Sequence, residues 1–211
     1  PIPFDLRKAH EVNKSFWAIG SLLLTQGCAD NEEDPSEKGN SRPPPLFVER
    51  SAKFGIMFQH DSGANGKYYL PESLGAGCGL FDADGDGDLD ALFVRGHDLD
   101  KPAAANSRNS FFRNDGSGQF TEETLSAGFD GLAYSYGVTC GDVDADGDLD
   151  VYITNLGEDT LYYNDGKGHF TQASKNAIAA KNDFSVSSCF LDYDRDGDLD
   201  LFVTRYMDWS I

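Results

Sequence analysis

The feature that most constrains this chain is an aspartate-rich stretch that occurs three times. "DADGDGDLD" begins at residue 82, "DVDADGDLD" at residue 142 and "DYDRDGDLD" at residue 192. Each copy has aspartate at positions 1, 3, 5, 7 and 9 and glycine at position 6. Carboxylates this close together repel one another, so the folded chain needs a compensating cation or strongly polar surroundings. The fold must therefore contain three similar loops that can neutralise local negative charge.

A longer repeat surrounds these loops. "FFRNDGSGQFTEETLSAGF" (111–129) aligns with "LYYNDGKGHFTQASKNAIA" (161–179) at an offset of 50 residues, which is also the spacing of the second and third loops. The first and second loops are 60 residues apart, and the ten extra residues fall in the segment 95–110. A second insertion, 60–72, precedes the first loop. We therefore expect units of about 50 residues, with two insertions near the first.

Every part of this unit is typical of β-structure. "LDALFV", "LDVYIT" and "LDLFVT" have the composition of buried strands. "NDGSG" and "NDGKG" supply residues that accept positive φ in tight hairpins. Units of this length with about four strands are typical of propeller blades. The predicted fold is all-β: a partial β-propeller of about three four-stranded blades over residues 46–211, interpreted as the front part of a longer propeller.

The acidic loops predict metal sites with oxygen ligands. Alternating carboxylates on a tightly turning backbone direct their oxygens to a common point, and the glycine at position 6 lets the carbonyl of position 7 turn inward. Calcium fits such a site better than magnesium, and the loops have no His or Cys for zinc or copper. Asp and Gly are also common in plain turns, which is the alternative for a single copy. The predicted ligands of about three Ca²⁺ sites are Asp82, Asp84, Asp86, Asp88, Asp90, Asp142, Asp144, Asp146, Asp148, Asp150, Asp192, Asp194, Asp196, Asp198 and Asp200.

These loops differ from EF-hands. An EF-hand has a bidentate glutamate at position 12 and flanking helices. Position 12 here is Phe93, Ile153 or Val203, each in an apolar segment. The prediction is therefore a calcium-binding β-hairpin loop.

The N-terminal segment has the features of an export signal. Basic residues precede an apolar run from Phe16 to Leu24 that is too short to span a bilayer. Gly27-Cys28 resembles a lipoprotein cleavage site, with Cys28 as the lipidated residue, although Thr25 stands where such sites prefer Leu. An ordinary signal peptide and a short buried helix are the alternatives. The predicted organisation is a signal-like segment (1–27), an acidic, proline-rich disordered linker (28–45) and the repeat region (46–211).

The net charge restricts the partners. At −19, the chain lacks the excess of Lys and Arg with which proteins neutralise nucleic-acid phosphates or anionic membrane surfaces. We therefore expect no nucleic-acid partner, and membrane attachment only through a lipid at Cys28.

The loops and the "LYYNDGKGHFT" segment between them resemble FG-GAP/VCBS-type propeller repeats, like those of the integrin α-subunit head. More narrowly, "YYLPESLGAGCGLFDADGDGDLD" with "RYMDW" is similar to the ASPIC/UnbV group, the cartilage acidic protein family and its bacterial relatives. The resemblance covers about residues 46–211. It implies a seven-bladed calcium-binding propeller, secreted or bound to the cell envelope, usually without assigned catalysis. The C-terminal module that names the group does not occur in this sequence.

Two classes of function follow. The first is an exported, non-enzymatic scaffold that binds a protein or glycan, including a lipid-anchored adhesin, with calcium in a structural role. The alternative is an extracellular enzyme of hydrolase type, but the four histidines lie in unrelated contexts and only Glu72 stands out as a candidate acid or base. Cys78, Cys140 and Cys189 each lie just before an acidic loop, and we expect them to be buried free thiols.

Overall fold

The computed structural model describes residues 46–174 and 183–208. The chain divides into two compact parts, Pro1–Lys53 and Phe54–Ile211. The predicted signal-like segment, most of the predicted linker and Cys28 lie outside the described residues. The strands of the described residues all belong to the second part, Phe54–Ile211.

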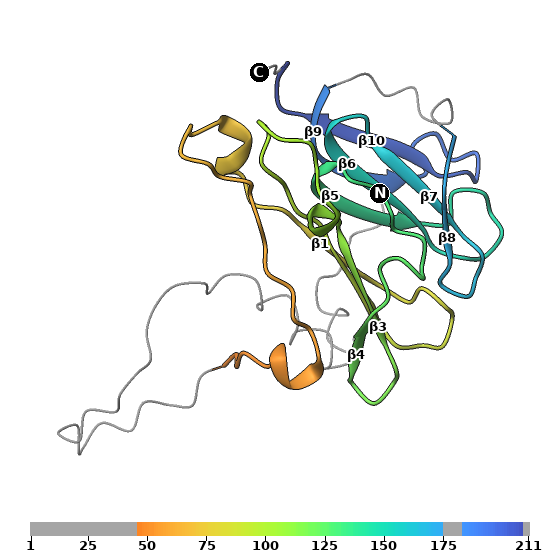
Figure 1. The fold of residues 1–211 in the computed structure, drawn as a ribbon. Helices are drawn as coiled ribbons and strands as arrows, with labels where there is room; N and C mark the ends of the chain where they lie inside the picture. The colour runs from red at the N-terminus through yellow and green to blue at the C-terminus, as the bar shows by residue number, and fades with distance from the viewer. Residues whose placement is uncertain (1–45, 175–182, 209–211) are drawn as a thin grey trace. The chain divides into compact units, whose positions relative to one another are not determined.

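The described chain is built from antiparallel strands (Figure 1). Short 3₁₀ helices are its only helices: η2 (Ala52–Phe54), η3 (Leu70–Ser73) and η4 (Ala105–Ser107). The strands are β1 (Cys78–Phe81), β2 (Asp90–Phe93), β3 (Ser110–Asn114), β4 (Phe120–Glu122), β5 (Tyr134–Gly141), β6 (Asp150–Gly157), β7 (Thr160–Asn164), β8 (Phe170–Gln172), β9 (Asp183–Leu191) and β10 (Asp200–Arg205). The all-β prediction is confirmed. Within this part of the chain, no helix has the length and apolarity of a membrane span.

The strands form one sheet of four strands and one of six. The first follows the order β1-β2-β3-β4, as expected for one unit. The second repeats this pattern in β5 to β8, but it also includes β9 and β10, because Leu156 and Gly157 of β6 pair with Phe184 and Asp183. The expected separate sheets of four strands are therefore observed only for the first unit. β6 runs past its hairpin with β7 and so joins the second unit to the third.

Strands β1, β5 and β9, the first of each unit, lie next to one another. Glycines permit this proximity: a Cβ on Gly79 of β1 would come within 2.7 Å of Val138 on β5. Likewise, a Cβ on Gly141 of β5 would come within 2.8 Å of Phe190 on β9. The acidic loops leave these neighbouring strands at the same end, so the close packing places all three loops on one side of the sheets.

The main core lies between the first two units. Phe81 and Phe111 of the first sheet pack with Phe170 of β8, and Phe129, from the segment after β4, contacts both Phe111 and Phe170. These four rings are at most 4% exposed. This aromatic cluster is the principal apolar contact that holds the two repeats together.

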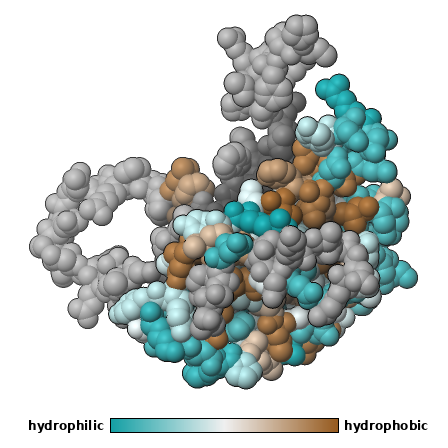
Figure 2. All heavy atoms as spheres, turned by 90° about the horizontal axis from the view of Figure 1, so that it is seen from above, coloured by the Kyte–Doolittle hydropathy of each residue, from teal (hydrophilic) through white to brown (hydrophobic). Residues whose placement is uncertain are grey.

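Strand β10 of the third unit is largely exposed, whereas the corresponding strands β2 and β6 are largely buried. Leu201 and Phe202 of β10 are 37% and 60% exposed. Figure 2 shows, on the face seen from above Figure 1, a group of hydrophobic residues beside hydrophilic ones. Cys78, Cys140 and Cys189 are free thiols, but only the first two are partly buried, packed against the cores. The expectation of a buried thiol is wrong for Cys189, because the β9–β10 hairpin that carries it is largely exposed.

Candidate metal centres

Each acidic loop connects the first two strands of its unit: β1–β2, β5–β6 and β9–β10. In each loop three carboxylates converge, with one oxygen from each within 4.8 Å of the others. Calcium binds oxygens at about 2.3–2.6 Å, so ligands on opposite sides of one ion are about 4.6–5.2 Å apart. The donor set therefore fits a single calcium ion in each loop. The converging side chains are Asp82, Asp84 and Asp86; Asp142, Asp144 and Asp146; and Asp192, Asp194 and Asp200.

The local backbone shapes the first two loops through the aspartate at position 1. Asp82 accepts the N–H groups of Gly85 and Gly87 at 2.8 and 2.9 Å, one on each oxygen. Asp142 accepts the N–H of Gly147 at 3.0 Å in the same way. The glycine at position 6 has φ of +92°, +99° and +100° in the three loops, a left-handed conformation that favours glycine. The glycine predicted to allow the sharp bend therefore does so in each copy.

The aspartate at position 9 lies outside the converging groups of the first two loops, and its role there as a ligand stays a prediction. Asp90 accepts the N–H of Ala83 within its loop at 3.0 Å and the N–H of Asn114 on β3 at 2.7 Å. Asp150 accepts the corresponding N–H groups of Val143 and Asn164, at 3.0 and 2.9 Å. Both aspartates are 1% exposed. Burial raises the pKa of Asp90 to about 6 against the opposing effect of its two N–H donors, and burial also raises the pKa of Asp150. These buried carboxylates fasten each loop to its sheet, and a nearby divalent cation would favour their charged forms.

The aspartate at position 7 faces the next hairpin turn rather than the converging group. A Cβ on Gly116 would come within 2.7 Å of an oxygen of Asp88, and a Cβ on Gly166 would overlap Asp148. Desolvation raises the pKa of Asp148, and repulsion from Asp146, Asp142 and the nearby Asp165 adds to it. Asp88 and Asp148, like Asp196 and Asp198, are therefore outside the three converging groups, and their role as ligands stays a prediction.

Sequence reasoning missed the residues that join each of the first two acidic loops to the following NDG turn. The side-chain amides of Asn114 and Asn164 donate to the carbonyls of Leu89 and Leu149, at 3.3 and 3.2 Å. Arg113, immediately before the first NDG turn, forms an ion pair with Asp84. The repeated "NDG" carries the only local signal of these contacts, and the same residues are also typical of a plain tight turn.

Of the candidate residues for an enzyme, only Glu72 and His97 lie near a common side chain, that of Tyr134, within the described chain. Glu72 lies in the 3₁₀ turn η3, and its Oε1 is buried without a hydrogen-bond partner among the described atoms. Desolvation lowers the pKa of His60. His97 packs on the ring of Tyr134 at 5.6 Å, and His169 lies in an exposed turn, 3.4 Å from Asp165. Among the described residues, the only groups of three or more potential metal ligands are those in the acidic loops.

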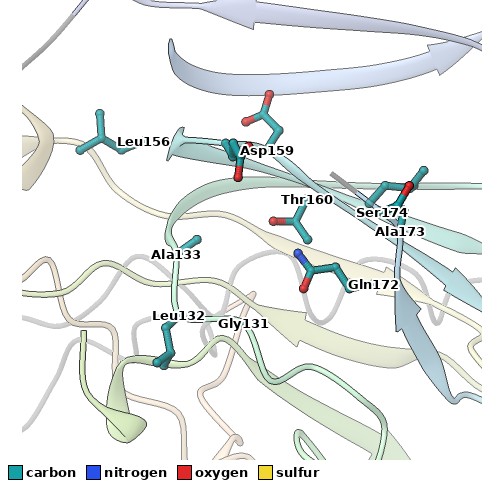
Figure 3. Close-up of a pocket in the computed structure, with 11 residues that line it drawn as sticks. Gly131, Leu132, Ala133, Leu156, Asp159, Thr160, Gln172, Ala173 and Ser174 are labelled. Atoms are coloured by element: carbon teal, nitrogen blue, oxygen red, sulfur yellow. The ribbon is translucent and has the colours of Figure 1, made fainter. Parts of the chain in front are cut away.

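A pocket of about 430 Å³ lies between the segment before β5, the β6–β7 turn and the end of β8 (Figure 3). Thr160 and Gln172 line it, and Asp159 lies at its edge. The Asp159 carboxylate is engaged elsewhere, because it accepts the hydroxyls of Tyr152 and Ser185, both at 2.8 Å. Its other oxygen accepts the N–H of Asn155 at 2.8 Å. Asp159 therefore connects β6 to β9, and Glu158 is the other carboxylate that lines the pocket.

The two insertions form a polar cluster that the sequence did not predict. The side-chain amide of Asn65, from the first insertion, donates to Asp98 of the second at 2.8 Å. Lys67 and Tyr69 both donate to Asp100, at 2.8 and 3.0 Å. The paired residues of this cluster are more than 30 positions apart in the sequence, so no local sequence pattern predicts it.

Comparison with known proteins agrees with this geometry. The family model described as an FG-GAP-like repeat matches residues 82–153 and again residues 142–203. The two matches together span more than half of the 211 residues, and each begins at an acidic loop. No curated protein sequence matches the chain.

Proposed function

Because the chain belongs to the FG-GAP-like repeat family, we propose that its repeat region is part of an extracellular β-propeller scaffold in which each acidic loop binds one structural calcium ion. The observation that carries the proposal is the convergence of three carboxylates in each of three equivalent loops. FG-GAP repeats are typical of extracellular, non-catalytic proteins. Export through the segment 1–27, a lipid at Cys28 and membership of the ASPIC/UnbV group belong to the same proposal.

The calcium ions would act on stability. When bound, an ion supplies positive charge that offsets the repulsion between neighbouring carboxylates. Extracellular calcium modules bind with Kd of roughly 10⁻⁴–10⁻³ M. At about 1 mM calcium and a Kd near 0.1 mM, binding adds roughly 1.4 kcal/mol per loop, or about 4 kcal/mol for three. That amount is a large part of the stability of a typical domain.

Thermal unfolding with and without calcium tests this proposal. We expect 1 mM calcium to raise the melting temperature of the chelator-treated protein by roughly 8–16 °C. The matched control replaces the position-3 aspartates together, Asp84→Asn, Asp144→Asn and Asp194→Asn, and its melting temperature should not respond to calcium. An unchanged melt of the unsubstituted protein on adding calcium would refute the structural role.

The ligand of the scaffold is a protein or a glycan under this proposal. The FG-GAP-like match favours a binding surface over catalysis. A protein and glycan array probed with and without calcium separates the two classes of function. Calcium-dependent capture without product formation supports the scaffold, whereas release of product supports a hydrolase.

A further inference from the structure

Arg113 makes the first acidic loop different from the second. Its Nη1 group forms an ion pair with Asp84, at position 3 of the first loop. The Arg113 side chain is 18% exposed, so its charge lies in a partly desolvated position. The position 50 residues later, which the repeat makes equivalent, is Tyr163. A positive side chain is therefore in contact with one candidate calcium ligand in the first loop.

Arg113 is also held by contacts outside the acidic loop. Its Nε donates to Glu123 at 2.8 Å, and its Nη2 donates to the backbone carbonyl of Gly168 at 3.1 Å. Gly168 belongs to the NDG turn of the second unit, and a Cβ there would overlap the guanidinium. These contacts do not depend on Asp84. The guanidinium would therefore stay beside the first loop whether or not a cation occupied it.

The second loop has no such charge. Asp144, the counterpart of Asp84, is exposed and has no hydrogen bond or ion pair within the described part of the chain. Asp84 is half-buried under Arg113, and its other oxygen faces the N–H of Asp86 at 3.3 Å. Two loops with the same pattern of aspartates therefore differ in the positive charge beside position 3.

We propose that Arg113 sets the calcium affinity of the first loop, so that this loop binds calcium more weakly than the second loop does. The inference rests on the proposed calcium sites. A cation bound to Asp84 would share that carboxylate with a fixed guanidinium, and like charges so placed oppose each other. At the high effective dielectric constant of a partly exposed loop, one such positive charge lowers the affinity for a divalent ion roughly three- to tenfold. The two loops would then fill one after the other as calcium rises.

Calorimetric calcium titration of the full chain tests the proposal, with all but one loop silenced. Asp144→Asn with Asp194→Asn leaves the first loop, and Asp84→Asn with Asp194→Asn leaves the second. We expect the first loop to bind roughly three- to tenfold more weakly at low salt, and the difference to shrink at 1 M salt because screening weakens the repulsion.

Swapped variants identify Arg113 as the cause. In the first-loop protein, Arg113→Tyr should strengthen calcium binding to the level of the second loop, whereas Arg113→Lys, which keeps the charge, should not. In the second-loop protein, Tyr163→Arg should weaken binding by a similar factor. Circular dichroism checks that each variant is folded, and Tyr163→Arg keeps the test valid if Arg113→Tyr unfolds.

Three results would overturn the proposal in distinguishable ways. Equal affinities of the two loops, or weaker binding in Arg113→Tyr, would refute the role of Arg113 while leaving the calcium sites intact. An affinity lost equally in Arg113→Tyr and Arg113→Lys would mean that Arg113 positions Asp84 through its geometry. Absence of calcium binding in both single-loop proteins would refute the calcium sites themselves.

Discussion

Removal of the Phe170 ring should weaken the packing between the first two repeats and so lower the free energy of unfolding. Phe170 is 4% exposed, and its ring lies 4.6 Å from Phe129, 5.9 Å from Phe111 and 6.0 Å from Phe81. A buried phenylalanine withdraws roughly 150–200 Å² of apolar surface from water, which corresponds to about 4 kcal/mol at 25 cal/mol/Å². Core Phe→Ala substitutions cost about 3–5 kcal/mol. We expect Phe170→Ala to lower the free energy of unfolding by this amount.

The repeat supplies a matched control for this prediction. Phe120 occupies the same place in the first "NDGxGxF" motif, but it is only partly buried, against the smaller cluster around Phe93 and Phe112. Phe120→Ala should therefore cost clearly less, about 1–2 kcal/mol. Urea unfolding in saturating calcium, followed by circular dichroism, gives both values. Equal losses in the two variants would show that Phe170 does not join the repeats through the aromatic cluster.

Three further predictions concern other parts of the repeat region. Burial raises the pKa of Asp159 above its ordinary 3.8, so this carboxyl group stabilises the fold fully below that pH and loses its contribution as the pH rises through the folded-state pKa. Measured by urea midpoints, the stability of Asp159→Asn relative to the unsubstituted protein should therefore increase between pH 3.5 and 7. Gly128→Ala should cost about 2 kcal/mol or more, because φ is +96° and the Cβ would overlap the carbonyl of residue 170, whereas Gly75→Ala, in open space, should be close to neutral in the same assay. Iodoacetamide at pH 8 should modify Cys189 well before Cys140, whose thiol pKa burial raises to about 12, and peptide mass mapping that finds equal rates would contradict this assignment.

The sequence predicted those features that are encoded locally. The acidic loops and NDG turns are short, repeated and chemically restricted, so their hairpins could be located from the residues alone. The all-β fold and the first sheet of four strands followed from the same pattern. The convergence of Asp82, Asp84 and Asp86 was also expected, because alternating side chains on a bent loop must meet.

Features that depend on distant residues could not be predicted in this way. The pairing of β6 with β9 requires residues 156 and 184 to meet, and nothing local in either segment specifies its partner. The contact between Arg113 and the carbonyl of Gly168 joins different repeats, and the polar cluster around Asp100 joins two insertions that have no counterpart in the second unit. Such contacts arise from tertiary packing, which a periodic pattern does not contain.

The position-9 aspartates show why the acidic pattern supports both a structural and a metal-binding interpretation. Asp90 begins β2, and its two oxygens accept one N–H from the loop and one from β3, so a single carboxylate connects the loop, its hairpin and the strand that leads into the next turn. Asp150 makes the equivalent contacts in the second unit. An ionised carboxylate buried in this way is costly unless positive charge lies nearby. Calcium at the neighbouring converging oxygens would stabilise that charge, so metal binding and hairpin formation would favour each other through the same side chain.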